Sequence, residues 1–155
     1  MAVEQLSWED APAFVQKLNE RIAGGGFRLP TEAEGEFSAR AGGAVASEGL
    51  ARVALFNAPG PAPVGGKQPN KLGLYDMQGN VWEWCSSLLL PYPYDAADGR
   101  ESPTAPGLRG LRGGGFADTA DFLDPAVRHG ERPQRWLLGN GMRIARPVPA
   151  SHPAR

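Results

Sequence analysis

The chain has 155 residues, a length that suits one domain, and its formal net charge at pH 7 is −1. A near-neutral chain lacks the basic stripe of nucleic-acid-binding proteins, so the composition argues against nucleic acid as the partner. The single cysteine, Cys85, excludes an internal disulfide. No apolar run approaches the roughly 18 residues of a membrane helix, and no signal peptide is evident. These features favour a cytoplasmic protein that binds no membrane, and they leave surface display open.

The first predicted helix follows Ser7, a residue type that often caps helix N-termini. Helical spacing predicts one buried stripe on this helix, made of Ala11, Phe14, Val15, Leu18 and Ile22. Glycines at 24–26 end it. A second helix is predicted from the capping-box pattern of Thr31 and Glu34, and it continues to Arg40.

The remaining chain is predicted to contain long loops and a few strands. Residues 42–71 are mostly loop, whereas the alternation at 81–85 is typical of a strand. Further strand candidates are 108–112 and 142–146, and the roughly 30 residues between them have no regular period. An aperiodic segment held between two strands is typical of a binding loop on a rigid platform. The proline-containing tail, residues 147–155, is predicted to be disordered.

Five sequence blocks then stand in order: SWEDA at 7–11, RLPTEAE at 28–34, GLYDMQGNVWEW at 73–84, RGGGF at 112–116 and GMRIAR at 141–146. Together they resemble the formylglycine-generating-enzyme (sulfatase-modifying factor) family. The resemblance implies an α+β C-type-lectin fold over residues 1–146, with two helices, a small twisted antiparallel sheet and much irregular loop.

Two departures from the family pattern concern the scaffold. The family usually has Trp at the position of Gly35, so a packing anchor is lost here. The family's usual strands ahead of the SWEDA block are largely absent. The sheet must therefore be completed differently, or this is a reduced family member.

A third departure concerns catalysis. The family's oxidase branch uses two cysteines between its Arg-Gly-Gly-Ser and Gly-Phe-Arg blocks, where thiolates bind copper and activate oxygen. The matching interval, 115–141, has no cysteine, and Cys85 lies outside it. The sulfoxide-synthase branch needs three histidines from an added domain, and this chain has only His129 and His152. The resemblance therefore implies a protein that is not an enzyme and requires no cofactor.

Variable proteins of diversity-generating retroelements often share this fold, with the altered codons between an Arg-Gly-Gly motif and a final Gly-Phe-Arg. The sequence resembles such a variable protein. This resemblance implies a hypervariable region at 117–140 that binds an unknown protein or other macromolecule. The alternative is an accessory or signalling module of the same fold, and a copper-dependent oxidase is the weaker rival. The predicted ligand-binding residues are Asp118, Thr119, Asp121, Phe122, Asp124, His129, Glu131, Gln134, Trp136, Leu137, Leu138 and Asn140.

Two features of this region have alternative interpretations. The apolar run 136–138 is either a core plug under a loop or an exposed anchor of the kind found at binding hot spots. The three aspartates at 118, 121 and 124 form a solvated acidic face or bind a cationic group or metal, although their spacing is not that of an EF-hand loop. His129 is expected to serve a surface or ligand-contact role rather than catalysis.

The resemblance also implies a structural calcium site. In the family, a side-chain oxygen, two backbone carbonyls and a Glu bind the ion, and the matching residues here are Asp76, Gly79, Val81 and Glu83. The alternative is that Asp76 and Glu83 cap turns and pair with arginines such as Arg112 or Arg143. The framework arginines, which also include Arg128, are expected to brace loop carbonyls and carboxylates. Cys85 is expected to be a buried small hydrophobe.

Overall fold

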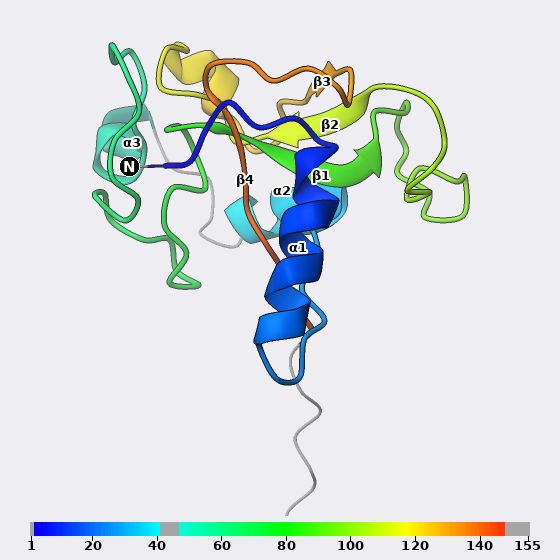
Figure 1. Ribbon diagram of the computed structural model, residues 1–155. Helices are drawn as coiled ribbons and strands as arrows, with labels where there is room; N and C mark the ends of the chain where they lie inside the picture. The colour runs from blue at the N-terminus through cyan, green and yellow to red at the C-terminus, as the bar shows by residue number, and fades with distance from the viewer. Residues whose placement is uncertain (1, 41–46, 148–155) are drawn as a thin grey trace, which may run out of the picture.

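The structure is a computed structural model that describes residues 2–40 and 47–147 (Figure 1). The predicted disordered tail lies outside these residues except for Pro147. The elements in chain order are α1 (Asp10–Arg21), α2 (Glu32–Arg40), α3 (Ser47–Val53), β1 (Trp82–Leu88), β2 (Arg109–Arg112), a short 3-10 helix η1 (Ala120–Leu123), β3 (His129–Glu131) and β4 (Asn140–Met142). The α+β class with much irregular loop is confirmed.

One sheet contains the four strands in the order β3-β2-β1-β4. β1 pairs antiparallel with β2, and β2 with β3, but β1 and β4 run parallel, with Trp82 beside Asn140. The small sheet that the resemblance implies is present, but it is mixed: two of its three pairings are antiparallel and one is parallel. The reason is topological: the chain leaves β3 at one edge and crosses to the opposite edge, where β4 enters in the direction of β1.

Two segments predicted as loop contain regular structure. α3 lies within the predicted loop 42–71, and η1 and β3 lie within the supposedly aperiodic interval before β4. Leu50 and Ala54 of the α3 region pack on Leu123 of η1 in a small second core. These elements are too short for hydrophobic periodicity to reveal, because each has only three to seven residues.

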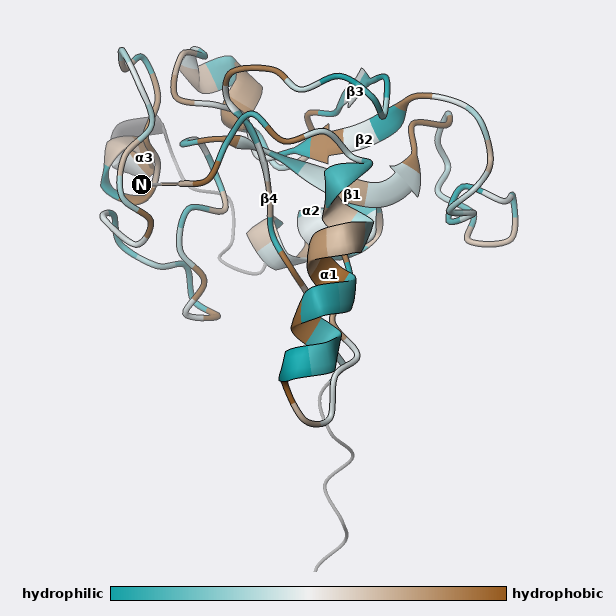
Figure 2. Ribbon diagram, viewed as in Figure 1, coloured by the Kyte–Doolittle hydropathy of each residue, from teal (hydrophilic) through white to brown (hydrophobic). Residues whose placement is uncertain are grey.

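Ser7 caps the turn ahead of the first helix, but the helix begins at Asp10 with Glu9 at its N-cap, so the predicted N-cap is two residues early. The predicted buried stripe is wrong. Ser7 and Asp10 exchange hydrogen bonds, with Ser7 N to Asp10 Oδ2 at 2.8 Å and Asp10 N to Ser7 Oγ at 3.2 Å. Of the stripe, only Ala11 is buried, whereas Phe14 is 47% exposed and Ile22 is 39% exposed. The helix joins the body at its first turn and then projects away from the sheet, with hydrophilic residues between the hydrophobic ones (Figures 1 and 2).

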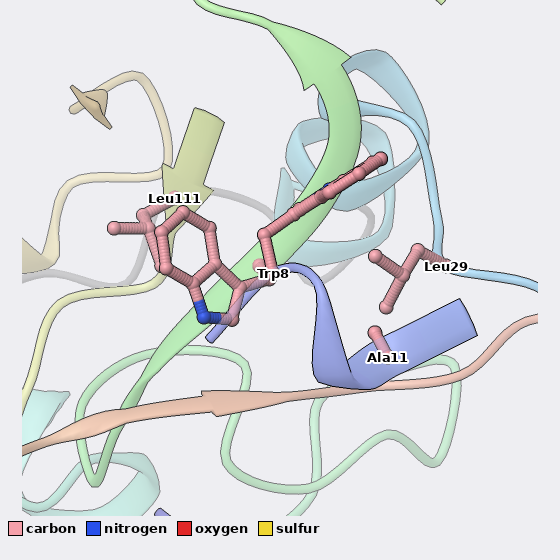
Figure 3. Packing of buried hydrophobic residues seen from close by; sticks show 5 residues of the cluster. Trp8, Ala11, Leu29 and Leu111 are labelled. Atoms are coloured by element: carbon pink, nitrogen blue, oxygen red, sulfur yellow. The ribbon is translucent and has the colours of Figure 1, made fainter. Parts of the chain in front are cut away.

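The main core forms where α1 begins. Trp8, Ala11 and Leu29 pack against Trp84 of β1 and Leu111 of β2 (Figure 3). Both indoles also satisfy their polar edges, because Trp8 Nε1 donates to Cys85 O at 2.9 Å and Trp84 Nε1 donates to Leu6 O at 2.8 Å. The core therefore ties the N-terminal segment to the central strand.

The capping box of α2 is confirmed by bonds from Glu34 N to Thr31 Oγ1 at 3.1 Å and from Thr31 N to Glu34 Oε2 at 2.8 Å. Its first residue, Glu32, is fully buried between two arginines. Arg128 binds both Glu32 carboxylate oxygens, at 2.7 and 2.5 Å, and Arg112 Nε lies 3.2 Å from Oε1. Arg112 and Arg128 are thus the braces that the sequence predicts.

None of the helices among the described residues is both long and apolar enough to cross a bilayer.

Replacing Glu32 with Ala is expected to lower the free energy of unfolding by about 3–5 kcal/mol, because the mostly buried Arg128 loses its carboxylate and the buried Arg112 keeps only Glu36. Urea unfolding followed by tryptophan fluorescence measures this change. Glu20→Ala on the exposed face of α1 is the matched control and should change stability by less than about 0.5 kcal/mol. Equal effects of the two variants would contradict the bracing role.

Candidate ligand-binding surface

The interval 117–140 lies at the end of the molecule where η1, β3 and the segment leading to β4 are found, at the top of Figure 1. Trp82 at the start of β1 contacts the segment before η1, β3 and the segment leading to β4. Its Nε1 donates to Asp118 Oδ2 at 2.7 Å, its ring lies 5.5 Å from that of His129, and its backbone N donates to Gly139 O at 2.8 Å. A half-buried tryptophan therefore underlies this surface.

Most of the predicted ligand-binding residues are accessible. Eight are exposed: Thr119, Asp121, Phe122, Asp124, His129, Gln134, Trp136 and Leu138. Asp118, Glu131 and Leu137 are half-buried. The exposed fraction is 67% for Trp136, 68% for Leu138 and 50% for Phe122. The core-plug alternative is thus wrong for Trp136 and Leu138, which face solvent.

Asn140 is a wrong prediction, because it is only 4% exposed. It pairs with Trp82 in the sheet, its N–H donates to Leu137 O at 3.1 Å, and its carbonyl accepts from Leu6 N at 3.2 Å. Strand pairing therefore turns this residue inward, where it cannot contact a partner.

The three aspartates have different surroundings. Asp118 accepts hydrogen bonds at Oδ2 from Trp82 Nε1 and from Gly115 N, at 2.7 and 2.8 Å, so it fixes the loop after β2. Asp124 Oδ1 accepts from Ala126 N at 2.7 Å in a local turn, and Asp121 is exposed. Among the described residues, no three His, Cys, Asp or Glu side chains are grouped to hold a metal. Asp121 and Asp124 are exposed, whereas Asp118 is half-buried against Trp82 and Gly115, so the three do not form one solvated face.

The N-terminal segment holds the loop before β4 in place. Glu4 Oε2 accepts from Gly139 N at 2.6 Å, and Glu9 Oε1 accepts from Gln134 Nε2 at 2.6 Å. Glu9 N also donates to Pro133 O at 3.3 Å. Sequence reasoning missed this role, because contacts between residues about 130 positions apart leave no local pattern.

The four residues proposed for calcium do meet. Asp76, Gly79, Val81 and Glu83 line one pocket of about 370 Å³, together with Arg143. Arg143 Nε and Nη2 each lie 2.9 Å from an oxygen of Glu83, and Nη2 also donates to Tyr75 O at 2.9 Å. Burial raises the pKa of the Glu83 carboxyl, and Arg143 opposes that rise.

This donor set does not fit calcium as it is arranged, because a guanidinium already occupies both oxygens of its one Glu. The pairing of Glu83 with Arg143 is the alternative that the sequence left open. Asp76 Oδ2 is also engaged, since it accepts from Gly65 N at 2.6 Å.

Cys85 is buried, with 1% exposure, as the sequence predicts. Burial raises the pKa of its thiol well above the usual range. The thiolate is the form that attacks electrophiles and binds metals, and it is strongly disfavoured here. Cys85 is therefore a packing residue in this arrangement.

Comparison with known proteins places these features in context. The sequence matches the family described as the sulfatase-modifying factor enzyme 1-like domain over residues 1–148. It is 35% identical over 138 residues to the formylglycine-generating enzyme of Streptomyces coelicolor, covering 74% of this chain and 41% of that one. It is 36% identical over 140 residues to the inactive C-alpha-formylglycine-generating enzyme 2 of Mus musculus, covering 78% and 39%. The chain thus spans about two fifths of the length of these two relatives.

Among solved structures, Treponema denticola variable protein 1 superposes with a TM-score of 0.78 and 27% identity, covering 94% of this chain and 71% of that one.

Replacing Glu4 with Ala is expected to speed amide hydrogen exchange in 133–140 about tenfold, because the Gly139 N–H loses a charge-assisted hydrogen bond. Mass spectrometry of peptides from this segment measures the change. Glu20→Ala should leave the same peptides unaffected. Unchanged exchange in the Glu4 variant would mean that the loop holds its conformation without the N-terminal segment.

Millimolar calcium is expected to leave the melting temperature within about 1 °C of its value in chelator. Arg143→Met, by contrast, should lower the melting temperature, because the half-buried Glu83 loses its partner. Calorimetry with and without calcium tests both statements. A rise of several degrees that chelator reverses would establish the calcium site instead.

Proposed function

Since the chain belongs to the sulfatase-modifying factor enzyme 1-like family, we propose that it is a non-catalytic member that binds a macromolecular partner through residues 117–140. The partner is a protein or another macromolecule with an apolar recess. The chain would serve as a variable protein diversified by a retroelement.

The observation that carries this proposal is the exposure of large apolar side chains on a braced platform. Trp136 and Leu138 are each about two thirds exposed, and Phe122 is half exposed. Burying such side chains against a partner contributes about 1.5–3 kcal/mol each, and Trp is enriched at binding hot spots. Because the loop that presents Trp136 is already tied to Glu4 and Glu9, little ordering entropy opposes binding.

Polar residues around these anchors would supply selectivity. Thr119, Asp121 and His129 are exposed and offer hydroxyl, carboxylate and imidazole groups. A buried partner group left without a hydrogen bond is costly, so a few such contacts discriminate strongly between partners. Trp82 and Asp118 lie beneath and fix the backbone that carries them.

Three observations favour binding over oxidase chemistry. The chain has one cysteine, whereas the copper mechanism described for the family uses a pair. That cysteine is buried and lies in β1, outside the sequence interval between β2 and β4 in which the family places its pair. The similarity to a relative named inactive adds that members of this family can lack the activity.

The similarity to Treponema denticola variable protein 1 supports the proposal that a retroelement diversifies residues 117–140. The test is to sequence the coding DNA and its surroundings, comparing codons 117–140 with any near-identical copy. Substitutions confined to template adenines are the expected result. An invariant interval without a second copy would overturn the diversified-binder proposal and favour an accessory module.

The double variant Trp136→Ala/Leu138→Ala is expected to change the melting temperature by less than about 2 °C, because both side chains face solvent. Leu123→Ala is the matched control from the same interval, and it should cost about 2–5 kcal/mol because Leu123 is 1% exposed. Thermal unfolding by circular dichroism distinguishes them. A collapse of the double variant would place its residues in the core rather than at a binding surface.

A further inference from the structure

A cavity of about 300 Å³ lies between α2, the sheet and the segment after β4. It is on the face of β1 that carries Glu83 and Cys85, not the face of the Trp84 core. Its apolar wall includes Ala39, Met77, Cys85, Pro125 and Ile144. A volume of this size is at the lower end of the range for small-molecule sites, and about twice that of a cavity known to admit benzene.

Gly35 borders this space and has no side chain to fill it. It is the fourth of the nine residues of α2, where glycine weakens a helix relative to alanine. A Cβ built on it would lie 3.8 Å from Arg112 Cγ and 3.9 Å from Cys85 Sγ, which are ordinary contacts. Neither backbone conformation nor crowding therefore requires glycine here. The absence of a side chain leaves the space beside Arg112 and Cys85 unfilled.

The carboxylates at the wall already have counter-charges. Glu34 pairs with Arg28 at 2.6 Å, Glu36 with Arg112 at 3.0 Å, and Glu83 with Arg143 at 2.9 Å. Arg146 is stacked on the ring of Phe27, with 5.4 Å from its Cζ to the ring centroid. A cationic ligand would have to displace an arginine from one of these carboxylates. An anionic ligand would have to displace a carboxylate or draw Arg146 away from the Phe27 ring, whereas a neutral ligand leaves these contacts intact.

Two sulfur atoms in the cavity wall favour an aromatic ligand among neutral ones. Met77 and Cys85 both line the cavity, and sulfur makes favourable contacts with the edges of aromatic rings. The methylene stem of Arg112 adds a further apolar surface beside Gly35. We propose that this cavity binds a small, neutral aromatic molecule of one or two fused rings. This site is independent of the proposed partner-binding surface, with which it shares only Pro125.

Indole is the probe for the test, with benzoate as the charged comparison. Indole should raise the melting temperature of the full chain saturably, by at least about 2 °C, and benzoate should not. Indole should also perturb the amide resonances of Cys85 and Met77 and leave those of 136–138 unchanged. No saturable rise, or perturbation confined to 136–138, would overturn the proposal.

Gly35→Leu should fill the cavity and abolish the response to indole. Gly35→Ala is the matched control, because it makes the same change in helix propensity and leaves most of the space, so it should still respond. If Gly35→Leu does not fold, Ala39→Leu fills the space from the next turn of α2 and should also abolish the response. An indole response that survives in the filled variants would place the ligand elsewhere and refute the assignment.

Discussion

The buried carboxylate of Glu32 is the centre of the contacts that connect α2 to the rest of the domain. Glu32 receives Arg128 at both oxygens and Arg112 at one, and Ser87 Oγ accepts its backbone N–H at 2.9 Å. Arg112 then reaches the carbonyls of Pro125 and Val127, at 2.8 and 3.3 Å. A chain with so little regular structure has many loop carbonyls that need hydrogen-bond donors. One arginine guanidinium group can donate to several of them at once. The positions of β2 and of the interval that follows it both depend on this cluster.

Local sequence signals predicted the parts of the fold that local forces determine. The capping box of Thr31 and Glu34 and the alternation that became β1 are both present, since each involves neighbouring residues. The α1 stripe failed for a different reason: periodicity indicates which residues share a helix face, not whether another element covers that face. The parallel pairing of β4 was likewise beyond prediction, because it depends on where a loop returns.

The sequence predicted most of the exposed residues of the candidate surface, but it did not predict the contacts that hold the surface in place. Trp136, Leu138 and Phe122 are exposed, yet Asn140 is turned inward by its pairing with Trp82. The role of Glu4 is a contact across nearly the whole chain, and no spacing rule could indicate it. Glu83 pairs with Arg143, one of the arginines that the sequence offered as its partner, and residue type alone did not identify which one.

The loop before β4 is held largely by its main chain. Its amide at 139 and its carbonyls at 133, 139 and 140 make the bonds that anchor it to Glu4, Glu9, Trp82 and Leu6. Main-chain groups are the same whatever side chain is attached, apart from proline. The side chains at 136 and 138 can therefore be exchanged without changing the anchors. The backbone conformation of this loop is thus independent of the side chains that it presents. A change in those side chains could alter which partner is bound while the loop keeps its conformation.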